Sequence, residues 1–361
     1  MNVALTGLPL SGKTCVFDAV SEGAVDSSAH PARAEHPNIA QVNVPDDRLD
    51  WLFEHARPPK KVPVQIEWLD LPGLAPGRSD LAAQNTAVME HLRRADALVL
   101  VLRAFNNPAA PHPRGRVDPR ADLDTLRAEF LISDLDVTLR RIERLEKQIL
   151  KPTPDREAHK RELDLLGRCR QALEAERPVH SAVQSDHERA MLRGFAFLTE
   201  KPCFLVLNVG EDAAGDPGAA AAPLKDLGAP VVAMCASLEA EISRLAPDER
   251  GPFMEEMGLK RFHAPDVLRG VHRALGRVTF FTMGDKEVAA RSLPEGTKAV
   301  DAAGAVHTDM AKGFIRAEVV HFEDFRQAGS LKEARTRGTL RLEGRDYVVV
   351  DGDVILFHFS R

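Results

Sequence analysis

The sequence predicts an α/β domain built on a parallel sheet, interrupted by a pair of helices and followed by a separate α+β module. Short apolar runs alternate with helical segments on both sides of a long charged stretch that has helical periodicity. From Arg277 onward the composition turns rich in strand-forming residues. We therefore expect residues 1–118 and 199–276 to form one domain, 119–198 a helical hairpin, and 277–361 the module.

The amino terminus has the pattern of a phosphate-binding loop. An apolar strand over residues 1–6 runs into Gly7–Thr14, which fits G-x-x-x-x-G-K-[ST]. Glycines at both ends of the pattern let successive N–H groups turn towards phosphate oxygens. Lys13 would contact the β- and γ-phosphates, Thr14 would bind Mg²⁺, and the helix beginning at Lys13 would direct its positive end at the anion. An ordinary Gly-rich turn is the alternative.

A second motif follows the strand predicted over Val62–Leu69. Asp70-Leu71-Pro72-Gly73 has the form D-x-x-G, in which the carboxylate holds Mg²⁺ through water and the glycine N–H bonds the γ-phosphate. The tetrapeptide alone is more often a turn. After a phosphate-binding loop, it predicts a magnesium partner. Residues 24–43 lack periodicity and stand where a nucleotide-sensing loop is expected.

The middle of the chain predicts a buried strand, a proline-rich loop and two helices. Leu98–Leu102 is the strand, and Asn106–Pro119 is the loop, in which His112 would ordinarily be a solvated side chain. A helix over 123–149 ends before Thr153, the expected N-cap of a second helix that starts at Pro154. The helices should form an antiparallel hairpin, either a structural arm or a partner-binding lever.

The remainder resumes the α/β pattern and then changes to β. Strands are predicted over 203–207 and 230–237, with a flexible surface loop over 212–223 and a closing helix over 265–275. In the module, strands are predicted over 278–281, 314–320, 347–350 and 354–359, the last two as a hairpin through Asp351-Gly352. Basic residues near its end indicate either an RNA-facing patch or a soluble surface: Arg326, Lys332, Arg335, Arg337, Arg341 and Arg345.

Composition narrows the class of protein. Hydrophobic residues make up 44% and charged residues 28% of the 361 positions, as in soluble globular proteins. The net charge of −6 argues against extensive coating of nucleic acid. We find no leader or membrane segment and expect a cytoplasmic protein. The four cysteines lack metal-binding spacing, which favours reduced thiols.

Several stretches together resemble the YchF and Obg-like ATPases, a family of translation-factor-class P-loop NTPases. The resemblance covers nearly the whole chain and is most specific at Val44–Asp50, Gly115–Pro119, Leu238–Ile242, Ala303–Asp309 and Lys312–Glu318. It implies that the C-terminal module is a TGS domain, which has a ubiquitin-like β-grasp fold. It also implies ATP and Mg²⁺ as ligands and the ribosome or its RNA as a partner, through the TGS domain and the hairpin.

The resemblance bears on the choice of base. Guanine-binding relatives use N-K-x-D, whose Asp pairs with the guanine edge and whose Lys packs along the base; the matching residues here are Asn208-Val209-Gly210-Glu211. With the Asp replaced by Glu211 and the Lys by Val209, guanine-specific pairing is lost. We therefore expect ATP to bind and GTP to bind more weakly, although a plain strand-end turn is an alternative.

Other positions bear on hydrolysis. Like the family, the chain lacks a glutamine after D-x-x-G and has Leu74 there, while His112 aligns with a loop histidine proposed to position the attacking water. The chain departs from the family at Leu10, where Asn is usual, and at Ala34, where a Mg²⁺-binding threonine belongs. Ser27 or Ser28 could replace that threonine only if the loop rearranged. Asp80–Asn85 replaces the glycine-rich G-x-G-x-G-N stretch of the second switch.

The sequence leaves two main interpretations: a slow ATPase, or a nucleotide-dependent binding module with little hydrolysis. An RNA-binding protein with an inert nucleotide domain is a third. We favour ATP binding with weak hydrolysis in a monomeric protein that does not bind membranes. The expected catalytic residues are Lys13 and His112, and the metal ligands are Thr14 and Asp70. The expected nucleotide contacts are Gly7, Leu10, Ser11, Gly12, Lys13, Thr14, Cys15, Gly73, Asn208, Val209 and Glu211.

Overall fold

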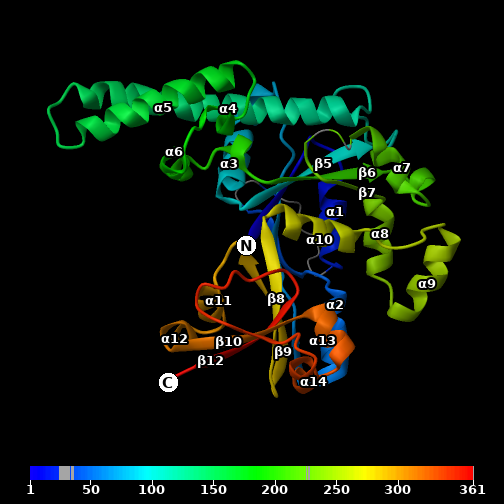
Figure 1. Ribbon diagram of the computed structural model, residues 1–361. Coiled ribbons are helices and arrows are strands. Elements are labelled where there is room, and N and C mark those ends of the chain that lie inside the picture. Colours follow the sequence, from blue (N-terminus) through cyan, green and yellow to red (C-terminus); the bar gives the residue numbers. More distant parts are fainter. Residues whose placement is uncertain (24–32, 34–35, 225, 227, 361) are drawn as a thin grey trace. The chain divides into compact units, whose positions relative to one another are not determined.

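The computed structural model describes residues 1–23, 33, 36–224, 226 and 228–360 (Figure 1). The chain divides into two compact units, one of residues 1–40 and 67–267, the other of residues 41–66 and 268–361. Residues 41–66 thus group with the C-terminal module, because β3 pairs with β9 of that module. Ala34, Ser27 and Ser28, which bear on the missing switch threonine, lie outside the described residues.

The first unit is organised around a six-stranded sheet with the order β2-β4-β1-β5-β6-β7. The pairs β1–β4, β1–β5, β5–β6 and β6–β7 are all parallel, which confirms the predicted α/β class. The strands are β1 (Asn2–Thr6), β2 (Asn38–Asn43), β4 (Gln65–Asp70), β5 (Ala97–Ala104), β6 (Cys203–Val209) and β7 (Val231–Met234). Helices of this unit before the hairpin are α1 (Lys13–Val20) and α3 (Ala82–Arg94).

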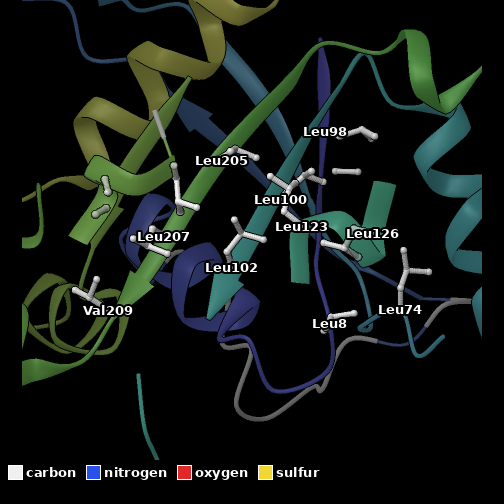
Figure 2. Close-up of a cluster of buried hydrophobic side chains, with 14 of the residues drawn as sticks. Leu8, Leu74, Leu98, Leu100, Leu102, Leu123, Leu126, Leu205, Leu207 and Val209 are labelled. Atoms are coloured by element: carbon white, nitrogen blue, oxygen red, sulfur yellow. The ribbon is translucent and has the colours of Figure 1, made fainter. Parts of the chain in front are cut away.

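Alternate side chains of the central strands build the core on one face of this sheet. Figure 2 shows leucines of β5 and β6 gathered near Leu123 and Leu126 of helix α4 (Pro119–Ile149). Leu8 of the loop after β1 and Leu74 of the loop after β4 belong to the same cluster. The neighbours of these strand leucines, such as Arg103, therefore face the opposite side of the sheet.

The inserted helices form the expected antiparallel hairpin. Helix α4 packs against α5 (Arg156–Glu174) around a core that includes Leu145, Leu166 and Cys169. The predicted start of α5 was wrong: Thr153 accepts a bond from Arg156 N through its carbonyl, so Pro154 lies in a turn before the helix. A short helix α6 (Asp186–Leu192) follows.

The hairpin is fixed to the first unit at Asp134. This carboxylate is fully buried in the middle of α4. It accepts hydrogen bonds from Arg93 at the end of α3 and from the backbone N–H groups of Leu198 and Thr199. Arg93 also donates to Ser133 Oγ. A buried charge with this many donors is fully compensated.

The stretch after β6 is more helical than expected. The predicted flexible loop over 212–223 contains α7 (Pro217–Ala221) between two 3₁₀ turns, and Pro217 and Ala221 are buried. Pro217 suits the first helical turn because its missing N–H has no partner to lose there. The other helices of this region are α8 (Ala236–Ser243), α9 (Pro247–Glu256) and α10 (Ala264–Ala274), the predicted closing helix.

The second unit has a mixed six-stranded sheet with the order β11-β10-β12-β8-β9-β3. Its strands are β3 (Lys60–Val62), β8 (Arg277–Met283), β9 (Glu287–Pro294), β10 (Phe314–His321), β11 (Arg341–Glu343) and β12 (Asp353–Phe359). Its helices are α2 (Asp47–Ala56), α11 (Ala299–Val306), α12 (Thr308–Lys312), α13 (Phe322–Ala328) and α14 (Leu331–Thr336). Antiparallel β8–β9 and parallel β12–β8 pairs, with α11 against the sheet, make the expected α+β module.

The hairpin predicted around Asp351-Gly352 was wrong. Strand β12 instead pairs antiparallel with β10 and parallel with β8. Residues 347–350 form only an isolated antiparallel bridge, from Val348 to Lys298, which is flanked by backbone bonds of Tyr347 to Ala299 and of Val349 to Thr297. Pairing stops there, since Val350 N donates to Asp353 Oδ2. All four cysteines are free, as expected. Among the described helices, none combines the length and apolar character needed to cross a membrane.

Candidate functional site

The phosphate-binding loop has the geometry that its sequence predicts. It connects β1 to α1, and Gly12 stands before the helix in the left-handed region, at φ 84°. A Cβ atom at Gly12 would lie 2.1 Å from Asn208 Nδ2, and one at Gly7 would lie 2.5 Å from the carbonyl oxygen of Val101. Both positions are therefore closed to larger residues, and the backbone can approach a ligand closely.

Lys13 is buried inside this loop. Its Nζ donates to the carbonyl oxygen of Leu8 at 3.0 Å. Burial lowers the pKa of Lys13 to about 8, and the nearby charge of Asp70 opposes that change. The ammonium group is thus held where phosphates would arrive, in surroundings that favour an anionic partner.

Thr14 and Asp70 meet as the two sequence motifs require. Thr14 Oγ1 donates to Asp70 Oδ2 at 3.0 Å, and Asp70 is fully buried. The other oxygen, Oδ1, is buried and has no hydrogen-bond partner among the described residues. Burial raises the pKa of Asp70, opposed by the bond from Thr14 and the charge of Lys13. A hydroxyl beside a carboxylate with an unused oxygen fits Mg²⁺, which would neutralise phosphate charge there.

Asn38 belongs to this cluster, although it was not among the candidate residues. It begins β2, and its Nδ2 lies 3.4 Å from Asp70 Oδ2. The fact that an amide follows a proline at a strand start was too weak a signal to assign it to the site.

The second switch begins in contact with the phosphate-binding loop. A Cβ atom at Gly73 would lie 2.6 Å from Pro9 N, so only glycine fits in this position. Leu74 N donates to the carbonyl oxygen of Gly7 at 3.0 Å, and the Leu74 side chain is buried in the core shown in Figure 2. Because an apolar, buried side chain cannot bond a water molecule, Leu74 does not orient one.

Asn208, the first residue of the base motif Asn208–Glu211, holds the phosphate-binding loop through hydrogen bonds. Asn208 Nδ2 donates to the carbonyl oxygen of Ser11 at 3.1 Å, and its Oδ1 accepts from Ala236 N. The side chain of Val209 packs in the core, so only its main chain is available to a ligand. Glu211 is exposed at the start of a 3₁₀ turn. The motif thus provides one amide that is fixed within the protein, at Asn208, and one exposed carboxylate, at Glu211.

The remaining loop candidates have less definite roles. Leu10 is half exposed and adopts a left-handed conformation at φ 63°, which is uncommon for a residue with a branched side chain. Ser11 Oγ is buried and has no partner among the described residues. Cys15 is partly buried, and burial raises the pKa of its thiol. Its thiol is therefore protonated near neutral pH.

His112 is buried, contrary to the expectation of a solvated loop residue. Its Nε2 lies 2.9 Å from Asp122 Oδ2, and its Nδ1 accepts a bond from Arg114 N. Nε2 must therefore be the protonated nitrogen that donates to Asp122. No hydrogen bond among the described residues joins His112 to the phosphate-binding loop. Its role towards water stays a prediction.

Phe105 is a second residue that the sequence analysis missed. It follows β5, and its ring lies between the two motifs: a Cβ atom at Gly12 would be 3.8 Å from Phe105 Cε1, and one at Gly210 would be 3.4 Å from Phe105 Cβ. The guanidinium carbon of Arg103 lies 4.4 Å from the centre of this ring and covers one face, so only the other face could stack on a purine. An aromatic residue just after a buried strand at the ligand-binding edge was the available signal.

Most of the basic residues near the C-terminus are paired with carboxylates. Arg326, Arg335, Arg337 and Arg341 form ion pairs with Glu323, Glu318, Glu333 and Glu343 respectively. Arg345 lies over the ring of Phe314. These pairs lie at the surface and are individually weak, so the choice between an RNA-facing patch and a soluble surface stays a prediction.

A phosphate-binding loop, a D-x-x-G carboxylate and an asparagine bracing the loop, all at one edge of a parallel sheet, define a P-loop nucleotide-binding domain of the GTPase type. The family model described as 50S ribosome-binding GTPase matches residues 2–143. A second model, YchF-GTPase_C, described as a protein of unknown function (DUF933), matches residues 278–360.

Full-length relatives identify the family. The chain is 35% identical to the ribosome-binding ATPase YchF of Bacillus subtilis, over 100% of this chain and 99% of that protein. It is 32% identical to Obg-like ATPase 1 of Caenorhabditis elegans, over 100% of this chain and 92% of that protein. The structure of the Schizosaccharomyces pombe YchF GTPase superposes with a TM-score of 0.83 at 27% identity, covering 99% of this chain and 97% of that one. The chain belongs to the YchF and Obg-like ATPase family.

Proposed function

We propose that this protein binds ATP with Mg²⁺, hydrolyses it slowly to ADP and phosphate, and works in the cytoplasm as a ribosome-associated monomer. The observation that carries the proposal is the complete phosphate site: Lys13 buried in the loop, and Thr14 bonded to an Asp70 whose second oxygen is unused. The names of the full-length relatives, which specify ATPase and ribosome binding, support the activity and the partner.

Three groups would act on the nucleotide. Lys13 and the loop N–H groups would stabilise the charge of the β- and γ-phosphates. Thr14 and Asp70 would hold Mg²⁺, which supplies further neutralisation of that charge. Phe105 would offer its ring to adenine, because it lies between Gly12 and Gly210. No group among the described residues is bonded so as to orient water at the loop, which supports slow hydrolysis.

A nucleotide-dependent binding module with negligible hydrolysis is the second candidate. It is favoured by one observation: Leu74 is packed in the core at the position where an orienting side chain would be needed. In this case the helical hairpin and the C-terminal module would be the surfaces that contact the ribosome.

A single-turnover assay separates the two candidates. Protein in excess over labelled ATP and Mg²⁺ is followed for retained nucleotide and for released phosphate, with Lys13→Ala as the control. Phosphate release that disappears in Lys13→Ala is the result expected of a slow ATPase. Retained ATP without release would support the binding module, and failure to retain ATP would overturn both.

The choice of base has its own test. Glu211→Asp restores the shorter carboxylate of guanine readers at an exposed position, and we expect GTP affinity to rise by about tenfold, since one charged hydrogen bond is gained. Val209 is left unchanged, because a lysine in this buried position would place a charge in the core. Competition titrations of ATP and GTP measure the effect. Unchanged GTP affinity would contradict our account of base selection, and Glu211→Gln serves as the neutral control.

A further inference from the structure

Arg103 is a buried cation next to the phosphate-binding loop. It occupies the end of β5 and is 1% exposed. All three of its hydrogen bonds go to main-chain carbonyl oxygens: Nε to Phe105, Nη1 to Leu10 and Nη2 to Ala110. Among the described residues, no carboxylate forms an ion pair with it. Buried arginines are more often compensated by a carboxylate, so this arrangement calls for an explanation.

The bond to Leu10 reaches the loop itself. Arg103 of β5 is the register partner of Asn208 of β6, and these two side chains donate to the consecutive loop carbonyls of Leu10 and Ser11. Each carbonyl shares a rigid peptide plane with the next residue's N–H group, and the two point in opposite directions. Arg103 therefore helps to fix the peptide plane between Leu10 and Ser11, whose N–H donates to the carbonyl oxygen of Leu8 at 3.4 Å, and Asn208 fixes the plane that carries the Gly12 N–H. Loop N–H groups are what a phosphate-binding loop presents to its ligand.

The other two bonds extend the contact beyond the loop. Nε bonds the carbonyl of Phe105, and the guanidinium carbon lies 4.4 Å from the centre of that ring. Nη2 bonds the carbonyl of Ala110 at 2.7 Å, in the segment that carries His112. A planar guanidinium carries five donors on three nitrogen atoms and can bond three separate carbonyls at once. A lysine ammonium carries its donors on a single atom and cannot reach all three carbonyls in this geometry.

We propose that Arg103 is a positioning residue of the nucleotide site, which joins the phosphate-binding loop, the Phe105 ring and the His112 segment through its guanidinium group. The inference rests on the proposed function, since it assigns Arg103 to ATP binding. Its positive charge is buried beside the loop, and the carboxylate of Asp122, which accepts from His112, interacts with it electrostatically without forming an ion pair. Arg103 would therefore act on the nucleotide through the loop and the His112 segment, by holding their carbonyls in place. The alternative is a core residue that satisfies loop carbonyls and has no effect on the ligand.

The test compares Arg103→Met and Arg103→Lys with Arg250→Met. Arg250 is a matched control, because its guanidinium also donates to two main-chain carbonyls, those of Leu245 and Ser243, at the end of α8. Fluorescent ATP and ADP are titrated into each variant under conditions where urea unfolding shows it to be folded. In parallel, amide hydrogen exchange is measured for residues 106–116 with and without ADP.

We expect Arg103→Met to lose about tenfold or more in affinity for both ATP and ADP, because hydrogen bonds from a charged donor are lost. Arg103→Lys should recover little of the loss, since the charge alone does not restore three bonds. Exchange in 106–116 should be faster in both variants before any nucleotide is added. Arg250→Met should lower the free energy of unfolding and leave both affinities unchanged.

Two results would overturn the proposal. One is wild-type ATP affinity in Arg103→Met together with a lower free energy of unfolding, which would make Arg103 a structural residue only. The other is full recovery by Arg103→Lys, which would assign the effect to charge and not to the three-way contact. Wild-type protein and Lys13→Ala are titrated alongside: if the wild type binds no ATP, the proposed function fails, and the exchange of 106–116 in nucleotide-free variants still decides whether the contact exists.

Discussion

The phosphate-binding loop and the second switch touch at Gly73 and Pro9, but the chain holds them by different means. In the loop, Lys13, Arg103 and Asn208 each donate to a main-chain carbonyl, so the backbone is set from three directions. The second switch is held by residues within the same segment. Leu74 near its start is buried, and Asn85 near its end accepts from the N–H and donates to the carbonyl of Ala75.

This difference indicates that the phosphate-binding loop is built to bind the ligand, whereas the second switch is poorly built to respond to it. A loop oriented by side chains from β5, β6 and α1 is prepared for phosphate before any ligand arrives. The family resemblance implies glycines in the second switch where this chain has Asp80–Asn85, and Asp80 is paired with Arg78 at the surface. We infer that erosion has affected the segments that respond to the ligand and left those that hold it.

The largest effect should come from Lys13→Ala. Removing a buried charged donor from the loop should weaken ATP and ADP binding by about 10- to 150-fold. Lys201→Ala is the control, because Lys201 is partly buried and, like Lys13, donates to a main-chain carbonyl, that of Ala95. Equilibrium titration measures both variants. Unchanged ATP affinity in Lys13→Ala would show that binding does not depend on this loop. It would contradict our view that the loop is prepared to bind phosphate.

The pH dependence of ATP binding tests the same lysine. In the nucleotide-free protein the pKa of Lys13 is about 8, below its ordinary value of 10.5, so the side chain becomes neutral as the pH rises through 8. Because phosphates favour the charged form, ATP affinity should fall by up to about tenfold per pH unit above 8. Lys13→Arg stays charged throughout and should show a flat profile over the same range. Parallel profiles for the two proteins would rule out Lys13 as the titrating group.

The same shift affects the stability of the nucleotide-free protein in the opposite sense. A lysine whose pKa is lower in the folded state favours folding when it is neutral. This contribution is complete above the unfolded value of 10.5 and is lost as the pH falls through 8. Burial of the charged ammonium near neutral pH therefore costs stability that a bound nucleotide can return.

Turnover should respond to the first switch. Ala34→Thr supplies the hydroxyl that the family resemblance implies for Mg²⁺ at this position, and if its absence limits hydrolysis, single-turnover release should rise by about tenfold or more. Ala34→Val has the same shape without the hydroxyl and should leave the rate unchanged. Equal rates in the two variants would shift the limitation to the second switch, where Asp80 and Ala82 replace glycines.

The smallest effect should be on stability. Leu10 holds a left-handed conformation that costs a residue with a Cβ atom about 1–2 kcal/mol, and asparagine tolerates it better. Leu10→Asn should raise the free energy of unfolding by about 1 kcal/mol in urea titrations. Leu10→Ala keeps the Cβ atom and should gain little. If both variants gain equally, exposure of the leucine side chain and not backbone strain accounts for the change.

The sequence predicted those parts of the fold that depend on local chemistry. The phosphate-binding loop, the D-x-x-G motif and the two hairpin helices follow from spacing, glycine positions and apolar periodicity, and the structure confirms the elements. The strand predicted at 347–350 failed because its backbone groups bond Thr297 and Ala299, far away in sequence. Local β-forming residues cannot reveal such partners.

The candidate site was also predictable only where its chemistry is carried by a local motif. Gly12, Lys13, Thr14 and Asp70 carry their chemistry in a short motif. Arg103 and Asn38 do not, because each acts through a contact with another strand end or loop that only the folded chain brings near. The burial of His112 likewise depends on Asp122, which belongs to the following helix. Residues whose role is to orient a neighbour leave little trace in a single sequence.

Asp134 fixes the base of the helical hairpin and leaves its outer part, which we call the tip, open to substitution. Its carboxylate accepts from Arg93 and two backbone N–H groups, and breaking a buried pair of this kind costs about 3–5 kcal/mol, so substitutions there should destabilise the fold. The outer part of α4 and α5 carries mainly exposed charged residues, such as Arg140 and Glu157, whose substitution changes stability little. The tip can therefore diverge between lineages and adapt to a different partner surface while the nucleotide domain keeps its fold.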